Sequence, residues 1–193
     1  MIGARLAPTV EGVDSPDSAD ALRARTFDAL LDRLALDRAY RTARIILLDA
    51  TEAEDATHDA ALSAWRRFGE LRDPDRFDAW FGRILVNACR DRLRARRRLP
   101  ISIEGVPVGA LDRAWSPDPG DRAGTADVLR GALRQLRPDH REVIALRYQA
   151  DLTVDEIALR TSTRPGTVKS RLHYALRHLR TSVEAAEARS ASR

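Results

Sequence analysis

Between about residues 21 and 98, apolar residues recur every three or four positions, which is the spacing of an amphipathic helix. The first stripe consists of Phe27, Leu30, Leu31 and Leu34, and Tyr40, Ala43 and Leu47 continue it. Thr51 and Glu54 have the spacing of a capping box, which predicts that another helix starts there. Gly69 and the pair Asp73-Pro74 interrupt the pattern, and a last helix is expected over about 75–97.

A second helical pattern covers about residues 127 to 180. Its first apolar stripe, which Pro138 ends, comprises Val128, Leu129, Ala132, Leu133 and Leu136. Thr153 and Glu156 form a second capping box before a short helix. A polar turn over 161–164 follows, and Pro165 stands where proline favours the first turn of the next helix, which should reach about residue 180. This order predicts a helix-turn-helix.

The remaining segments lack a helical period. Residues 1–20 are small, polar and rich in Pro and Gly, which predicts a disordered tail, and 181–193 is expected to fray into a second one. Residues 99–126 contain four prolines and four glycines, which indicates a linker. Its apolar residues leave two interpretations open: it lies along the surface of a partner, or it packs on its own domains.

These segments predict an all-α fold with two small helical domains, 21–98 and 127–180, joined by a flexible linker. Aromatic residues make up only 5% of the chain, while Ala and Leu are plentiful, which favours helices packed on helices.

Several classes of protein are excluded on composition. No apolar run approaches the ~20 residues of a membrane span, and residues 1–10 lack the apolar core of a signal peptide, so we expect a cytoplasmic protein. The single cysteine, Cys89, is interpreted as a small packing residue. The four histidines have no metal-ligand spacing, and no nucleophile elbow or phosphate-binding Gly loop is present. We therefore expect no metal, no cofactor, no small-molecule substrate and no enzyme activity.

The net charge of +4 is distributed unevenly, and two basic helices stand out. Residues 164–180 carry five positive side chains and no acid, with Thr167 and Ser170 beside Lys169. This mixture suits phosphates and base edges, although a solvated basic helix would have a similar composition.

The second basic helix covers residues 83–98, with seven arginines against the single acid Asp91. On a helical wheel, one stripe consists of Arg83, Asn87, Arg90, Arg94 and Arg97. Arginines can hold a phosphate backbone, and an amide can both donate to and accept from a base. The simpler alternative is a solvated helix end whose arginines favour the helix dipole.

Trp65, Trp80 and Phe81 allow two interpretations, since aromatics beside a basic stripe can stack on unpaired bases but at helical spacing more often form a core. An acidic patch at the start of its helix comprises Glu52, Glu54, Asp55 and Asp59. The helix dipole accounts for this patch locally, and so would a basic partner surface.

Two segments of the chain resemble a known protein family. Residues 138–180, including "REV", "LRY", "EIA" and "GTVKSRL", closely resemble region 4 of sigma-70-type RNA polymerase sigma factors, above all the extracytoplasmic-function (ECF) group. Upstream, "EDATHDAALSAWRRF" and "FDAWFGRILVNACRDRLRARRR" are similar to region 2. The resemblance covers about 25–98 and 127–180 and implies that the chain directs transcription initiation of a specialised regulon.

The resemblance implies roles for the first domain. Its core polymerase-binding face, for the clamp helices of the largest subunit, would comprise Asp55, His58, Asp59, Leu62 and Trp65. The loop 69–76 and the helix through Asn87 would capture the melted non-template strand of the −10 element. The −10 contacts would come from Arg83, Asn87, Arg90, Arg94 and Arg97.

The second domain, by the same resemblance, would read the −35 element as duplex and sit on the flap of the second-largest subunit. Its DNA-contacting residues would be Arg164, Thr167, Lys169, Ser170, Arg171, His173, Tyr174 and Arg177. The linker would run near the RNA exit path, and an anti-sigma factor is implied as an inhibitor that could hold the protein near the membrane.

One departure from the family pattern lies in the turn, where members commonly have Leu-Gly-Ile and this chain has Thr161-Ser162-Thr163. Without glycine, a positive φ at Ser162 is costlier. A competing hypothesis is a stand-alone helix-turn-helix regulator of duplex DNA. That hypothesis predicts a dimer and assigns no role to the arginine stripe.

Overall fold

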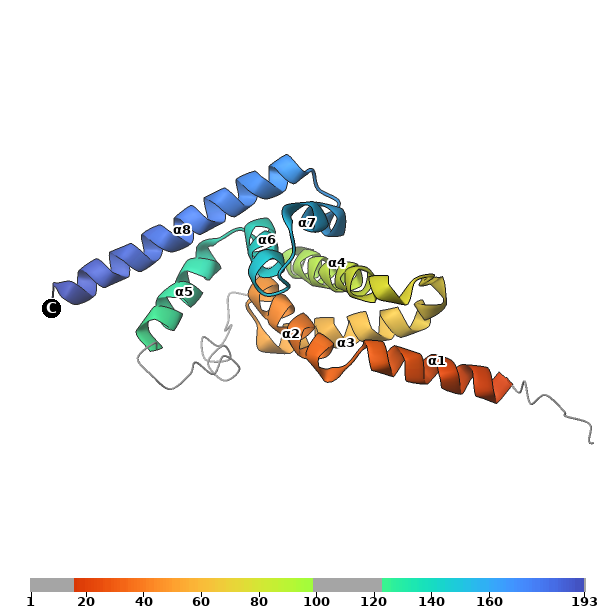
Figure 1. The fold of residues 1–193 in the computed structure, drawn as a ribbon. Helices are drawn as coiled ribbons and strands as arrows, with labels where there is room; N and C mark the ends of the chain where they lie inside the picture. Colours follow the sequence, from red (N-terminus) through yellow and green to blue (C-terminus); the bar gives the residue numbers. More distant parts are fainter. Residues whose placement is uncertain (1–15, 99–122, 193) are drawn as a thin grey trace, which may run out of the picture.

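The computed structural model describes residues 16–98 and 123–192, and every regular element in these ranges is a helix (Figure 1). The first part contains α1 (Pro16–Leu30), α2 (Arg33–Leu47), α3 (Ala50–Arg66), two 3₁₀ turns, η1 (Phe68–Glu70) and η2 (Pro74–Arg76), and α4 (Phe77–Arg98). The second contains α5 (Ala123–Gln135), α6 (Pro138–Tyr148), α7 (Val154–Thr161) and α8 (Pro165–Ala191).

The first part packs α2, α3 and α4 around one apolar core. Small residues of α3, including Ala53, Ala56 and Ala60, are fully buried and let the neighbouring helices approach closely. Phe27 of α1 and Phe77 of α4 close this core with edge-on ring contacts, their centroids 5.9 Å apart.

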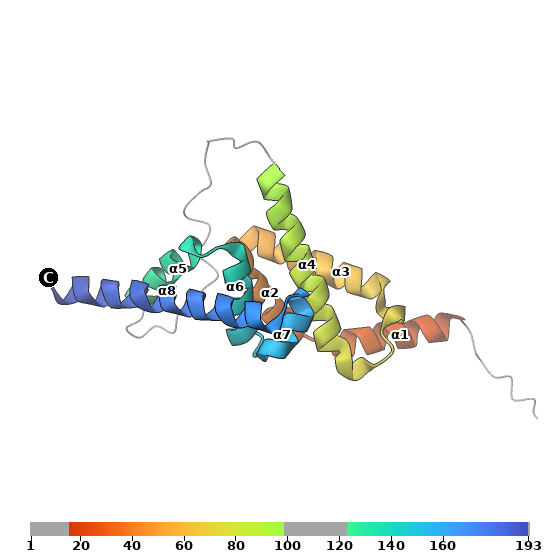
Figure 2. The ribbon, with the colours of Figure 1, turned by 90° about the horizontal axis from the view of Figure 1, so that it is seen from above.

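The second part is held by the inner faces of α6, α7 and α8, whose buried residues include Leu146, Ile157 and Val168. As Figures 1 and 2 show, α8 is a long helix that runs past α6 and α5 to the C-terminus. The spacing of Leu172, Leu176 and Leu179 predicts that all three lie on the inner face of α8. Leu172 is buried and Leu179 packs against the cluster, but Leu176 is exposed, so the prediction is wrong for Leu176.

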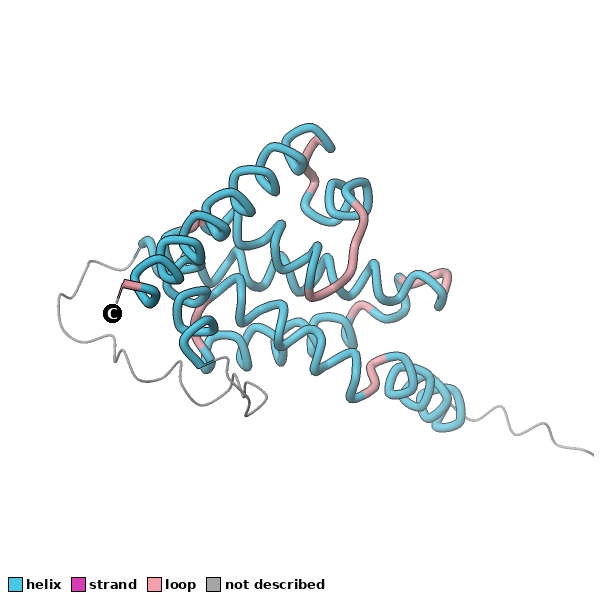
Figure 3. Tube along the Cα trace, turned by 60° about the vertical axis from the view of Figure 1, so that its left-hand side comes forward, coloured by secondary structure: helices cyan, strands magenta, loops and turns pink. Residues whose placement is uncertain are grey.

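The two parts also pack on one another. α6 lies against α2, and α7 lies against α4 (Figure 2). Figure 3 shows that the described part of the chain consists of helices joined by loops and turns. Val86 of α4 belongs to the apolar cluster of the second part, and Ala145 of α6 belongs to that of the first, and both are fully buried.

Three sequence-based expectations about element boundaries are wrong. The expected tail over 1–20 overlaps α1, which starts at Pro16, and the expected tail after 180 is part of α8, which continues to Ala191. Good helix formers and the absence of Pro and Gly after Arg180 explain this continuation. The linker prediction falls largely on 99–122, outside the described residues, and α5 already begins at Ala123.

The capping box predicted at Thr51 is also wrong, because the helix starts earlier. Asp49 caps α3, and its Oδ1 accepts a hydrogen bond from the Glu52 amide at 2.9 Å. Asp32 likewise caps α2 and accepts from Ala35 at 2.7 Å. This cap interrupts the apolar stripe expected to run through Leu34, whose side chain is exposed.

Candidate nucleic-acid and polymerase interfaces

The helix-turn-helix is formed by α7, its turn and α8. The capping box at Thr153 is confirmed: the Thr153 hydroxyl accepts from the Glu156 amide, and Glu156 accepts from the Thr153 amide at 2.7 Å. Pro165 occupies the first turn of α8, as expected. Ser162 ends α7 with φ 52°, so this left-handed position is filled by serine, where the family pattern has glycine.

The outer face of α8 carries most of the residues predicted to read DNA. The side chains that are exposed belong to Arg164, Lys169, Ser170, His173, Tyr174 and Arg177. Thr167 and Arg171 are half-buried. Since Val168, Leu172 and Ala175 are buried on the opposite side, α8 presents one polar, basic face to solvent.

Two of these residues are positioned by α6. The Arg171 guanidinium lies 3.2 Å from a carboxylate oxygen of Asp139, which fixes its direction and partly neutralises it. The Tyr174 ring packs against His140, with centroids 4.7 Å apart, and burial lowers the pKa of His140. Lys169 has no such contact among the described residues, so its charge stays fully available.

The arginine stripe on α4 is divided in two. Arg83, Asn87, Arg94 and Arg97 are exposed, as the helical wheel predicts, although Arg94 forms an ion pair with Asp91 at 2.6 Å. Arg90 is half-buried and engaged: it binds both carboxylate oxygens of Glu142 in α6 at 2.7 and 3.0 Å.

A groove of about 460 Å³ opens beside Asn87, between α3 and α4. Its polar lining comprises Asp59, Ser63, Arg67, Asn87, Asp91 and Arg92. The groove therefore offers both donors and acceptors next to the Asn87 amide. The neighbouring loop is braced by ion pairs of Arg67 with Glu70 at 2.8 Å and of Arg76 with Asp73 at 3.4 Å.

The predicted polymerase face on α3 is mostly accessible. Asp55, His58, Asp59 and Leu62 are exposed, whereas Trp65 is half-buried against Phe27. The acidic patch has an internal partner that the sequence did not indicate. Arg92 of α4 reaches Glu52 at 3.1 Å, Asp55 at 3.3 Å and Asp59 at 2.5 Å.

The positions of Trp65, Trp80 and Phe81 favour the interpretation that these aromatic residues form part of the core. Phe81 is 4% exposed and stacks on Phe77 at 5.7 Å, while Trp65 and Trp80 are half-buried against the same core. Cys89 is fully buried, and burial raises the pKa of its thiol to about 12, so it acts as the packing residue expected.

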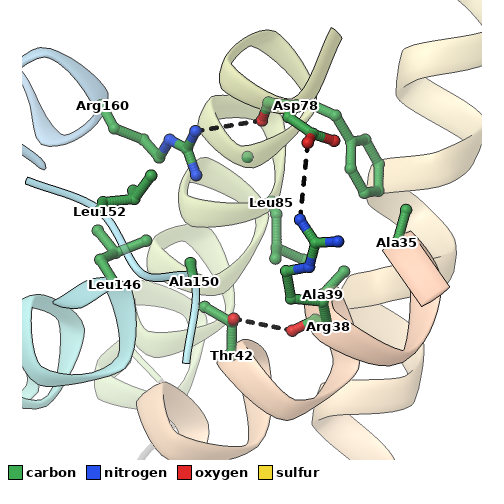
Figure 4. A pocket seen from close by; sticks show the side chains of 12 residues that line it. Ala35, Arg38, Ala39, Thr42, Asp78, Leu85, Leu146, Ala150, Leu152 and Arg160 are labelled. Atoms are coloured by element: carbon green, nitrogen blue, oxygen red, sulfur yellow. Dashed lines mark hydrogen bonds and ion pairs between the residues drawn. The ribbon is translucent and has the colours of Figure 1, made fainter. Parts of the chain in front are cut away.

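Several polar residues at the contact between the two parts were missed. Glu142 is almost fully buried, and burial raises its pKa against the opposing effect of Arg90. Arg160 of α7 donates to the backbone oxygen of Asp78 at 3.2 Å (Figure 4). In the sequence, the one sign that Glu142 is buried is its position directly before the apolar residues 143–146.

Comparisons with known proteins agree with this architecture. Residues 31–99 match the Sigma-70 region 2 family, and residues 126–179 match Sigma-70, region 4. The RNA polymerase sigma-E factor of Streptomyces coelicolor is 32% identical over 148 residues, which cover 77% of this chain and 81% of that protein. The ECF RNA polymerase sigma factor SigL of Mycobacterium tuberculosis is 32% identical over 153 residues, covering 75% and 82%.

Solved structures show the same fold. The sigma factor RpoE of Bartonella quintana, determined in complex with the anti-sigma factor NepR, superposes with a TM-score of 0.61 at 25% identity, covering 78% of this chain and 92% of that chain. CnrH, determined with the cytosolic domain of CnrY, gives a TM-score of 0.55 at 24% identity, covering 86% and 96%.

Within residues 16–98 and 123–192, none of the helices combines the length and apolarity that a membrane span requires. The two family matches occur in the order region 2, region 4, and the relatives are matched over four-fifths of their length. The chain belongs to the ECF group of sigma-70-type RNA polymerase sigma factors, which are transcription initiation factors and not enzymes.

Proposed function

We propose that this chain binds core RNA polymerase through α3 and directs it to promoters with two separate DNA-reading surfaces. Residues 21–98 and 127–180 are the two working units, and 99–126 connects them. The observation that carries the proposal is the presence of two exposed basic surfaces on different helices, one on α4 around Asn87 and one on α8 around Lys169.

The α8 surface suits duplex DNA. Lys169, Ser170 and His173 project from one exposed face near the start of the helix, so they could reach base edges and phosphates in a major groove. Asp139 holds Arg171 at the inner margin of this face, which limits its role to a phosphate or base at one fixed position.

The α4 surface suits a separated strand. The Asn87 amide stands between exposed arginines and beside an open groove, which offers space for an unpaired base and nearby charges for its phosphates. Unstacking a base costs a few kcal/mol, so these contacts must recover that energy.

The α3 surface supplies acids and one apolar side chain, Leu62, for a basic and apolar partner surface. The clamp helices of the largest polymerase subunit are the partner that we propose, with the flap of the second-largest subunit as the support of the α5–α8 unit. Since its partner is polymerase, we place the chain in the cytoplasm, with an anti-sigma factor as its inhibitor.

The direct test is size exclusion of the purified chain with core polymerase, followed by transcription of genomic fragments with the complex. We expect co-elution and transcripts that start at defined promoters. If the chain did not co-elute but bound duplex DNA tightly on its own, it would be a stand-alone regulator and the proposal would be wrong. An Asp55→Arg variant, with charge reversed on α3, should co-elute less well, whereas Glu184→Arg on α8 should not differ from the unmodified chain.

A further inference from the structure

A second groove, of about 320 Å³, is lined by α4, the first turn of α6, the turn after α7 and the start of α8. Its volume lies within the range of small-molecule ligand pockets. Its charged lining consists of five arginines and two acids, namely Arg90, Arg94, Arg97, Arg137 and Arg171 with Asp139 and Glu142. This excess of positive charge indicates an anionic ligand.

The two acids of this groove are shared among three of its arginines. Glu142 pairs with Nε and Nη2 of Arg90 at 3.0 and 2.7 Å, and Nη1 of Arg90 forms no hydrogen bond with a described residue. Asp139 serves two guanidinium groups, with Arg171 3.2 Å from one of its oxygens and Arg137 3.4 Å from the other. One carboxylate cannot neutralise two guanidinium groups, so the groove stays positively charged.

The α4 side of the groove adds two more cations. Arg94 and Arg97 are both exposed; Arg94 pairs with Asp91 at 2.6 Å, and Arg97 forms no ion pair with a described residue. They line the same groove as Arg137 and Arg171. Like charges around one groove repel each other, and a multivalent anion between them would replace this repulsion with attraction.

The first turn of α6 contributes in the same direction. Pro138 and Asp139 of this turn line the groove, and the cap residue Arg137 forms no side-chain hydrogen bond to the helix. The amides at the start of a helix and the positive end of its dipole favour phosphate groups. The helix end thus adds to the field of the arginines.

We propose that this groove binds a linear polyphosphate, either inorganic or carried by a nucleotide. Guanidinium groups bind phosphate oxygens in bidentate geometry, and arginines from three helices converge here. Successive phosphates of a polyphosphate share a bridging oxygen, so several charges fit into the groove. In a nucleic-acid strand a sugar separates the phosphates, so fewer of them fit into the same volume.

The inference goes beyond the proposed function, because the ligand binds the chain without polymerase or DNA. It has a consequence for promoter binding. Arg94 and Arg97 belong to the proposed −10 surface and Arg171 to the proposed −35 surface, so the ligand would occupy side chains of both. The expected competition with promoter DNA, unlike the binding itself, rests on the proposed function.

The test is isothermal titration calorimetry of the full chain with sodium tripolyphosphate, in magnesium-free buffer at about 150 mM salt to screen non-specific contacts. We expect one site per chain. Arg97→Gln and Arg137→Gln each remove one charge and should weaken binding by about three- to tenfold. Asp139→Asn removes the acid that holds Arg137 and Arg171, so it should tighten binding by about the same factor.

The matched control is Arg134→Gln on α5, an exposed arginine that does not line the groove, and its affinity should equal that of the unmodified chain. Arg97 and Arg137 are exposed as well, so their variants should fold, which circular dichroism checks. Arg94→Gln replaces either of them if helix is lost.

Two further ligands identify the source of the phosphates. GTP and ATP binding more tightly than tripolyphosphate would support the site and assign it to a nucleotide, whereas equal or weaker binding would support it as an inorganic polyphosphate site. A penta-thymidine oligonucleotide, with about the same charge, should bind several-fold more weakly than tripolyphosphate.

Three results would overturn the proposal. One is the absence of binding of tripolyphosphate, GTP and ATP to the unmodified chain. Another is an equal loss of affinity in Arg134→Gln and in the groove variants, which would show diffuse attraction to a basic protein. The third is penta-thymidine binding as tightly as tripolyphosphate, which would make the groove part of the DNA-binding surface.

Discussion

At Cys89, burial alone sets the chemistry of the side chain. The thiol is fully buried in α4, and desolvation raises its pKa to about 12. Since the thiolate is the nucleophile, the thiol should be unreactive at neutral pH. We expect no alkylation by iodoacetamide at pH 8 in the folded chain and stoichiometric alkylation in urea, measured by mass spectrometry. Rapid alkylation of the folded chain would show that this part of α4 opens readily.

A single substitution at the side-chain amide of Asn87 tests the proposed −10 surface. Asn87→Ala should impair promoter opening, because the donor and acceptor beside the groove are lost, while binding to core polymerase is retained. Opening can be followed with 2-aminopurine in the −10 element. Gln135→Ala, an exposed amide on α5 outside the groove, is the matched control. An equal loss of core binding in Asn87→Ala would show that its proposed role is wrong.

Single residues also mark the limit of sequence reasoning. The wheel correctly predicts that Arg83, Asn87 and Arg94 are exposed, because that follows from helical periodicity. It could not show that Arg90 is bound to Glu142, 52 positions away in sequence. For the same reason, the sequence could not show that Arg92 neutralises the acids of α3. The partner of a charge depends on tertiary contacts that no local pattern encodes.

The stability of helix α7 depends on the hydrogen bonds of its N-terminal cap. Thr153→Ala removes the hydroxyl that accepts from the Glu156 amide, and we expect the free energy of unfolding to fall by about 1 kcal/mol in urea titrations. Ser170→Ala, whose hydroxyl bonds within α8, should change it far less. Equal losses in the two variants would indicate that the cap has no special role.

The same cap predicts a pH dependence. Hydrogen bonds from the Thr153 amide and hydroxyl lower the pKa of Glu156. A lowered pKa in the folded chain stabilises it above the unfolded pKa, and this stability is lost as the pH falls through the folded pKa. In Glu156→Gln, stability should therefore decline less steeply between about pH 5 and 3 than in the unmodified chain. Glu184→Gln on α8 is the control. If the free energy of unfolding fell equally steeply with decreasing pH in all three proteins, the prediction would be contradicted.

Helix α8 carries the proposed −35 surface, and Lys169 is one of its cations that form no ion pair with the described residues. In the polymerase complex, Lys169→Ala should weaken binding to −35 duplex and reduce the slope of log affinity against log salt by about one unit. Arg189→Ala, exposed at the far end of α8, should not change that slope. A reduced affinity with an unchanged slope would mean that Lys169 contacts no phosphate.

The helices themselves were largely predictable, since their periodicity, the Thr153 cap and Pro165 are local signals. Errors arose where two local signals compete. Asp49 and Thr51 are both acceptable caps, and packing of the α3 alanines against α2 selects the earlier start. The length of α8 was underestimated because its last residues lose the apolar stripe although they still favour helix.

At the scale of the whole molecule, Val86 couples the two parts, because it belongs to α4 but packs in the cluster of α6–α8. Val86→Ala should lower the free energy of unfolding by about 1.5–3 kcal/mol. It should also cause the two parts to unfold in two separate transitions. In a Trp115→Phe background the remaining tryptophans, Trp65 and Trp80, report on the first part, whereas circular dichroism reports on both. Ile84→Ala, in the core of the first part, is the control.

Non-coincident urea curves in Val86→Ala, but not in Ile84→Ala, would confirm this coupling. Coincident curves in both variants would contradict it. The docking of the two parts was the feature least accessible from sequence. It depends on the fit of Gly82 to Arg160 and of Arg90 to Glu142, and neither pair has a signature at sequence separations of 78 and 52.

The bidentate pair of Arg90 has a thermodynamic consequence for promoter DNA. The Glu142 carboxylate and the Thr161 oxygen occupy Nε and Nη2 of Arg90, which leaves Nη1 for a strand phosphate. Linkage is reciprocal: whatever free energy a phosphate at Nη1 adds to or takes from the pair with Glu142, the pair adds to or takes from the affinity for the strand. A strand phosphate bound at Arg90 would thus couple promoter binding to the contact between α4 and α6 through a single side chain.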